Sequence, residues 1–194
     1  MRAMSKTSVM NAESGTDPTR TLPSWLRADL RSDHAGELGA VNIYEGILLI
    51  TKDPVVRAFA VEHLATERVH LASMETLLAP KHRSRLQWPW RGAGWLIGAV
   101  PAAIGSQWVF ATVATVETFV DKHYTEQIDR LTLANPGQIP GHITQLLQQC
   151  RADEVQHRQD AAARLSAPLS LPLRAWLKVV EWGSRGAVTV ARAI

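Results

Sequence analysis

The sequence is poor in the residues that build several kinds of protein. Among its 194 residues there is one cysteine, Cys150, so no disulfide can form within the chain and nothing points to an oxidising compartment. The first twenty residues are polar and lack the apolar stretch of a secretory signal, so we expect none there. Charged residues make up only 20% of the chain, against 46% hydrophobic residues, which excludes a largely disordered protein. At this length we expect one domain with tails.

Strand signals are also missing. No segment alternates apolar and polar residues over a sustained length, so we expect no β-sheet. Glycine and proline instead separate long blocks that are typical of helices. The chain is therefore predicted to be all-α, a ferritin-like four-helix bundle of two helical hairpins, with additional short and C-terminal amphipathic helices. Helices are expected over 23–51 and 53–79, in a short stretch before Pro101 and a long one after it, over 138–165, and beyond Pro172.

The same glycine and proline positions also predict the boundaries of the domain. Residues 1–22 are expected to form a disordered tail and residues 23–194 the folded domain. Asn135-Pro136-Gly137 is a strong turn signal between the last two bundle helices. The net charge is only +3, and lysine and arginine are dispersed along the chain. We therefore expect no nucleic-acid partner, whereas an anionic membrane surface remains compatible.

Two short motifs place a histidine three residues after a glutamate. They are Glu67 with His70, and Glu154 with His157. On a helix, residues at this spacing share one face and can reach one metal ion. A carboxylate together with an imidazole suits iron, manganese or zinc. One such pair would be a weak signal, but the two together indicate a metal site.

A single glutamate lies level with each motif in the predicted hairpins. Glu37 and Glu67 lie about 24 and 21 Å from the first interhelical turn, at 1.5 Å per residue. Glu117 and Glu154 lie about 28 and 27 Å from the second turn. A lone glutamate on two helices and a Glu-x-x-His motif on the other two is the ligand layout of ferritin-like di-iron and di-manganese bundles. Four carboxylates balance two divalent cations, so such a set can be buried together with metal.

The two tyrosines repeat this pattern. Tyr44 and Tyr124 each follow a lone glutamate by seven residues, so each lies on the face of that glutamate nearly two turns along. Tyr44 is interpreted as a core residue with a hydrogen-bonded hydroxyl. Tyr124 is favoured as a residue that contacts the substrate or the ligands.

Four further residues lie near the motifs. Asp33, one turn before Glu37, is expected to accept a hydrogen bond from a ligand histidine, and Asp153 is a weaker candidate for that role. His63 is expected to be solvated or to support the site rather than to bind metal. Cys150 is interpreted as a small core residue.

These residues resemble the demethoxyubiquinone hydroxylase family, the di-iron monooxygenases of ubiquinone biosynthesis. The resemblance covers roughly residues 26–194, and its most specific part is the DHAGE-x-GA stretch. The matching stretches are 31–40 (RSDHAGELGA) with Asn42, Tyr44 and Gly46, then 67–70, 115–117 with 123–124, and 153–157 (DEVQH). The resemblance implies that the six iron ligands are Glu37, Glu67, His70, Glu117, Glu154 and His157, with Glu67 and Glu154 as bridges. Ala152 and Arg158 depart from the family pattern but leave all six positions intact.

The resemblance also implies the reaction. Its substrate is a polyprenylated methoxy-methyl-benzoquinone, its cofactors are two iron ions per chain, O2 is the co-substrate, and NAD(P)H is the reductant. No motif for a nucleotide stands in the sequence, because the glycines of 92–98 follow no strand. Two alternatives remain open: an iron oxidase or manganese catalase on the same bundle, and a non-catalytic membrane-associated helical adaptor. Assembly with itself or with other proteins of ubiquinone biosynthesis is also open.

The segment 81–116 is expected to dock the protein on a membrane without crossing it, as a peripheral protein on the cytoplasmic face of the inner membrane. Residues 92–116 carry no charge and exceed the roughly 20 residues that span a bilayer, so a transmembrane helix is the rival reading. Pro101 interrupts that run, and Glu117 directly after it must lie in the bundle. The basic residues and tryptophans that favour docking are Lys81, Arg83, Arg85, Arg91, Trp88, Trp90, Trp95 and Trp108.

Overall fold

The structure, a computed structural model, describes residues 22–134 and 139–194. Within these ranges it contains helices and no strand, which confirms the all-α prediction. The elements are α1 (Ser24–Ile50), α2 (Pro54–Leu77), the short 3-10 helix η1 (Pro80–His82), α3 (Gln87–Ile104), α4 (Ser106–Thr132), α5 (Gly141–Ala163) and α6 (Leu171–Ala193).

Local chemistry accounts for where several helices begin and end. At the start of α2, the Asp53 carboxylate accepts a hydrogen bond from the Val55 amide at 2.8 Å, and Pro54 occupies the first turn, where no amide is required. At the start of α6, the hydroxyl of Ser170 caps the Leu173 amide at 3.4 Å. Between α3 and α4, Gly105 has a φ of 150°, which breaks the long uncharged run into two helices.

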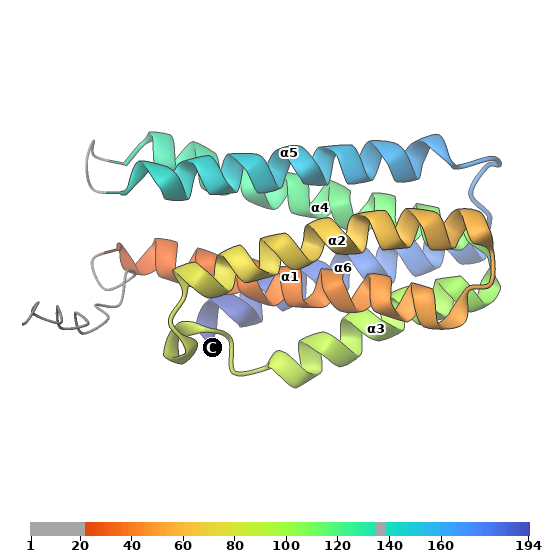
Figure 1. Ribbon diagram of the computed structural model, residues 1–194, viewed down its shortest axis with the longest axis horizontal. Coiled ribbons are helices and arrows are strands. Elements are labelled where there is room, and N and C mark those ends of the chain that lie inside the picture. The colour runs from red at the N-terminus through yellow and green to blue at the C-terminus, as the bar shows by residue number, and fades with distance from the viewer. Residues whose placement is uncertain (1–21, 135–138) are drawn as a thin grey trace, which may run out of the picture.

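Four long helices run side by side along the length of the protein, as Figure 1 shows: α1 with α2, and α4 with α5. These pairs are the two predicted hairpins. Helix α3 packs along α1, and α6 packs against both α1 and α4. The Arg31 side chain ties the end of α6 to α1, because its Nε donates to the Ala191 carbonyl at 2.8 Å. The six helices therefore share one core.

The core is divided along the helices into two apolar clusters. One contains Tyr44 and Phe59, and the other contains Leu30 and Leu147. Along α1, Leu30 precedes the buried carboxylate of Glu37 and Tyr44 follows it, and on α2, α4 and α5 a buried glutamate likewise lies between residues of the two clusters. A buried polar layer between apolar clusters is costly unless its groups are paired or bind metal. The fold thus places the predicted site in the middle of the bundle.

The glycines of the uncharged run serve helix packing. A Cβ on Gly94 would lie 3.0 Å from the Gly39 carbonyl carbon, and one on Gly98 would lie 2.8 Å from that of Ile43. Both approaches are to the backbone of α1, so only glycine permits this distance between α1 and α3. Gly46 on α1 meets α3 in the same way, since its Cβ would lie 3.1 Å from the Ala99 nitrogen.

Three boundary predictions need comment. The break expected at Pro101 is wrong: α3 runs from Gln87 through Pro101 to Ile104, and Gly105, with its φ of 150°, separates it from α4. The predicted turn at 135–137 and the predicted helix start at Gln138 lie outside the described residues, and α5 begins at Gly141. The predicted tail also lies outside them except for Leu22, which is buried in the core. Among the described helices, none is both long and apolar enough to span a membrane.

Candidate metal centre

The structure brings the six predicted metal ligands together in the polar layer of the bundle. Two groups of four residues each offer ligand atoms that all lie within 4.8 Å of one another. The first group is Glu37, Glu67, His70 and Glu154, and the second is Glu67, Glu117, Glu154 and His157. Glu67 and Glu154 belong to both groups, and all six side chains are buried.

The two histidines turn the same ring atom toward the carboxylates. His70 Nδ1 lies 3.2 Å from Glu154 Oε1, and His157 Nδ1 lies 3.0 Å from Glu67 Oε1. Each histidine therefore approaches the glutamate of the opposite hairpin's motif. His70 Nδ1 also lies 3.7 Å from Glu37 Oε2.

Each tyrosine bonds across the hairpins. Tyr44 donates its hydroxyl to Glu117 Oε1 at 3.2 Å, and Tyr124 donates its hydroxyl to Glu37 Oε1. Both rings are buried, so Tyr44 has the hydrogen bond expected of a core tyrosine. The pairing could not be read from spacing along one helix, because each tyrosine meets the lone glutamate of the other hairpin rather than its own.

The electrostatics of the cluster favour a cation. Burial and the neighbouring carboxylates raise the pKa values of Glu67 and Glu117. The pKa of Glu154 falls to about 2: burial opposes the shift, but the imidazole rings of His157 and His70 beside the carboxylate outweigh it. Both oxygens of Glu67 and the Nδ1 atoms of both histidines are buried without a hydrogen-bond partner. A metal ion bound among these side chains would give the unpaired oxygen and nitrogen atoms a partner.

The residues around the ligands differ in part from expectation. Asp33 contacts no ligand histidine: its Oδ1 lies 3.1 Å from His123 Nε2. Asp153, predicted as the weaker candidate, instead accepts from His70 Nε2 at 3.1 Å. The prediction for Asp33 is wrong because Asp33 lies on α1 and faces His123 of α4. Asp153 lies on α5, where it faces the Nε2 atom of His70 on α2.

Two other neighbours support the site. His63 Nε2 bonds Asp160 at 2.9 Å, and its ring lies edge-on against His157 at a centroid distance of 4.2 Å. Burial and the nearby His157 lower the pKa of His63 to about 4. Cys150 is fully buried in the core, as expected of a small core residue, and burial raises the pKa of its thiol to about 12.

A cavity of about 380 Å³ leads to the ligands. Its walls are mostly apolar and come from α1, α3, α4 and α6, while Glu37, Glu67, Glu117 and Glu154 line its polar part. Sequence reasoning missed the contribution of α6. A signal was present, because small residues recur at helical spacing on one face of α6 and line the cavity: Gly183, Gly186, Ala187 and Ala191.

Comparisons with known proteins are consistent among themselves. The family model described as ubiquinone biosynthesis protein COQ7 matches residues 24–191. The 3-demethoxyubiquinol 3-hydroxylase of Rhodospirillum rubrum is 35% identical over 164 residues, which cover 80% of this chain and 75% of the relative. The mitochondrial NADPH-dependent 3-demethoxyubiquinone 3-hydroxylase of Caenorhabditis elegans is 28% identical over 169 residues, 85% of this chain and 88% of the relative. A 3-demethoxyubiquinol 3-hydroxylase of Ectopseudomonas mendocina is 31% identical over 182 residues, 89% and 80% of the two chains.

Proposed function

The chain belongs to the family of ubiquinone biosynthesis protein COQ7, and on that premise we propose that it is a 3-demethoxyubiquinol 3-hydroxylase. It would be a di-iron, O2-dependent monooxygenase that hydroxylates the ring of a polyprenylated methoxy-methyl-benzoquinone. The observation that carries this proposal is a cluster of six buried carboxylate and imidazole side chains whose four carboxylates line a mostly apolar cavity.

The six residues fit two iron ions. Glu37 with His70 would hold one ion, and Glu117 with His157 the other. Glu67 and Glu154 would bridge them, since both belong to the two groups of ligand atoms. Two bound ferrous ions would supply the two electrons that, together with two protons, let O2 yield one oxygen atom for the ring and one molecule of water. A pyridine nucleotide would be the reductant, and some relatives are named NADPH-dependent.

The residues of the chain would position the reactants and exclude water. We propose that the bundle is ferritin-like and keeps the ligands rigid on four helices, with Asp153 orienting the His70 ring. Tyr124 lines the cavity and bonds Glu37, so it stands between the substrate and a ligand. The apolar walls would hold the quinone and keep bulk water from the reacting oxygen.

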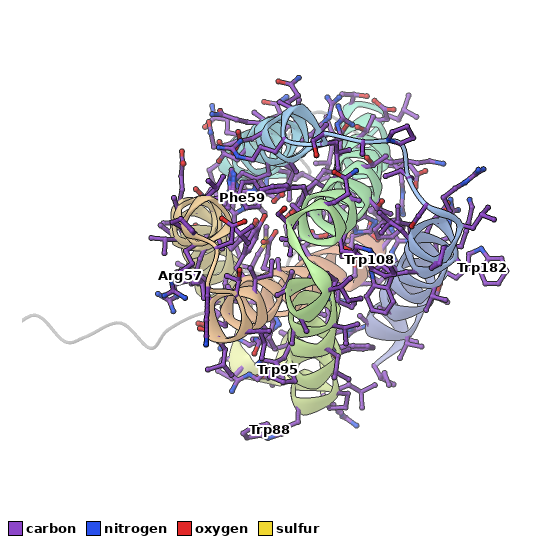
Figure 2. All side chains as sticks on the ribbon, turned by 90° about the vertical axis from the view of Figure 1, so that its right-hand side faces the viewer. Arg57, Phe59, Trp88, Trp95, Trp108 and Trp182 are labelled. Atoms are coloured by element: carbon purple, nitrogen blue, oxygen red, sulfur yellow. The ribbon has the colours of Figure 1, made fainter. Side chains whose placement is uncertain are left out.

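The cavity also offers a route for a long isoprenoid tail. Its apolar part lies between α3 and α6, which carry exposed apolar side chains. Trp88 is 80% exposed on α3 and Trp182 is 72% exposed on α6, and Figure 2 shows both pointing away from the body of the protein. We propose that these two helices rest on the cytoplasmic face of the inner membrane as a peripheral attachment.

The docking surface proposed here differs from the segment expected from sequence. Trp90 lines the cavity instead of facing outward, and Trp95 and Trp108 are half-buried. Arg83 pairs with Glu75 at 3.0 Å. The large exposed apolar side chains of α3 and α6 are Trp88, Leu96, Val100, Ile104, Leu171, Val179, Trp182 and Val190.

The test of function combines metal analysis with product identification. Iron-loaded protein, a reductant, O2 and a short-tailed demethoxyquinone should give the ring-hydroxylated product, with two irons per chain. Glu67→Ala should abolish turnover and most bound iron, because both ions lose a ligand. Glu45→Ala, which removes an exposed glutamate of α1 paired with Arg68, is the control and should keep both. Full iron and full activity in Glu67→Ala would show the ligand assignment to be wrong.

The test of docking is flotation with vesicles that contain anionic lipid. Replacing Trp88 and Trp182 together by serine should reduce vesicle binding severalfold, because two aromatic anchors are lost. The control replaces Val61 and Val69, exposed on α2, by serine and should bind like the wild type. Equal binding of both double variants would contradict the proposed surface.

A further inference from the structure

A buried polar cluster outside the six ligands lines the same cavity. It consists of Ser32 and Asp33 on α1 and His123 and Gln127 on α4. His123 Nε2 lies 3.1 Å from Asp33 Oδ1 and 3.2 Å from Ser32 Oγ. Gln127 Nε2 lies 2.6 Å from the same Asp33 oxygen and 2.8 Å from His123 Nε2. Ser32, Asp33 and His123 line the cavity, and Gln127 is fully buried behind them.

Asp33 keeps one oxygen without a partner. Its Oδ2 atom is buried and has no hydrogen-bond partner, although its Oδ1 atom is held by both His123 and Gln127. Leaving a buried polar atom unpaired costs free energy, and in native proteins such atoms commonly have a role. Because Asp33 lines the ligand cavity, this unpartnered oxygen indicates a place for a polar group of the ligand.

The other polar side chains of the cavity wall are already engaged. Apart from the ligand carboxylates, Tyr124 donates to Glu37, Ser184 donates to the Val180 carbonyl at 3.0 Å, and the Trp90 indole donates to Ser84 at 2.9 Å. Among the described residues that line the cavity, leaving aside the candidate metal ligands, Asp33 is thus the one whose side chain has a buried oxygen without a hydrogen-bond partner.

We propose that Asp33 binds a ring oxygen of the substrate, with His123 and Gln127 as the positioning residues that hold its carboxyl group. This inference rests on the proposed function, because it concerns how the quinone ring is oriented in that cavity. Asp33 precedes Glu37 by one turn of α1, a rise of about 6 Å. A six-membered ring bound at Asp33 would therefore present its far edge to the ligands.

A carboxyl group beside an imidazole suits both redox forms of such a ring. A quinone carbonyl needs a hydrogen-bond donor, whereas the hydroquinone hydroxyl also needs an acceptor. Asp33 and His123 share a contact through which a proton can pass, so the pair can offer either. Burial raises the pKa of Asp33, which favours its protonated, donating form.

The test compares two ligands in binding to iron-loaded protein without reductant. One is a short-tailed methoxy-methyl-1,4-benzoquinone, and the other is a methoxy-methyl-benzene without the two carbonyl oxygens. We expect Asp33→Leu to weaken binding of the quinone about tenfold in calorimetry, the effect of one buried hydrogen bond, and to leave the benzene analogue unchanged. Asp33→Asn, which can still donate and accept, should restore most of the affinity.

The controls separate binding from folding. Asp29→Leu removes another buried carboxylate of α1, one that pairs with Arg130 and does not line the cavity, so it should lower stability but keep the quinone preference. If Asp33→Leu does not fold, His123→Phe keeps a ring beside Phe119 and should weaken only quinone binding, by about threefold.

Two results would overturn the inference. One is an equal loss of affinity for both ligands in Asp33→Leu, and the other is no loss for either. If the wild type hydroxylates the quinone while either result is found, the proposed function stands and only this inference fails. If the wild type neither binds nor hydroxylates the quinone, both fail.

Discussion

The contact between α1 and α3 allows a sharp prediction about Gly98. In Gly98→Ala, the new methyl carbon would lie 2.8 Å from the Ile43 carbonyl carbon. Carbon atoms in contact prefer about 3.5–4.0 Å, and the Ile43 carbonyl oxygen would lie closer still, so α3 must move away from α1 by at least about 0.7–1.2 Å. Overpacking of this kind costs about 1–3 kcal/mol, and alanine returns about 0.5–1 kcal/mol of helix propensity. The net expectation is a loss of up to about 2.5 kcal/mol in the free energy of unfolding.

Gly92→Ala is the matched control on the same helix. A Cβ at Gly92 meets nothing within 4 Å, so this variant should gain about 0.5–1 kcal/mol. The assay is urea unfolding followed by circular dichroism, with iron content and the KM for a quinone measured alongside. Because α3 carries cavity-lining residues and no predicted ligand, Gly98→Ala should raise KM and keep its iron. A Gly98→Ala variant as stable as Gly92→Ala would refute the close approach of the two helices.

Three further predictions concern the candidate metal centre. Tyr124→Phe removes the hydrogen bond to Glu37 and should lower turnover at near-normal iron content; unchanged rates at limiting and saturating quinone would make Tyr124 a core residue only. Asp153→Asn should weaken metal binding roughly tenfold in chelator competition, because the carboxylate that orients His70 is lost, and equal affinity would exclude that role. Burial raises the pKa values of Glu67 and Glu117, so protons compete with metal; affinity should fall and proton release on binding should increase as the pH drops from about 8 to about 6. An affinity independent of pH would argue against metal binding by these carboxylates.

Much of this protein could be read from local sequence. The start of α2 at Pro54 follows from Asp53 as its cap, and the uncharged run does divide into two helices, but at Gly105 and not at Pro101, which lies inside α3. Four of the six candidate ligands also have a local signal, because a spacing of three residues puts a carboxylate and an imidazole on one face of a helix. Helical periodicity and turn-forming residues depend on only a few neighbouring residues, so both can be recognised in one amino-acid sequence.

The glycines of α3 mark the limit of that reading. Gly94 and Gly98 carry no dinucleotide signal, and nothing in the sequence identifies α1 as the helix that approaches them. Their requirement for glycine comes from backbone atoms of Gly39 and Ile43, which lie more than fifty residues away. A close approach between two helices requires small residues at the contact. Those residues alone do not indicate which other helix is approached.

Tertiary structure alone decided how the site is completed. Asp153 and not Asp33 meets His70, and Tyr124 meets Glu37 instead of the glutamate on its own helix. The cavity needs α6, whose end is bonded to Arg31 across 160 residues of sequence. Spacing along a helix determines which residues share a face. Which face of a distant helix those residues contact depends on how all six helices bury their apolar surfaces together.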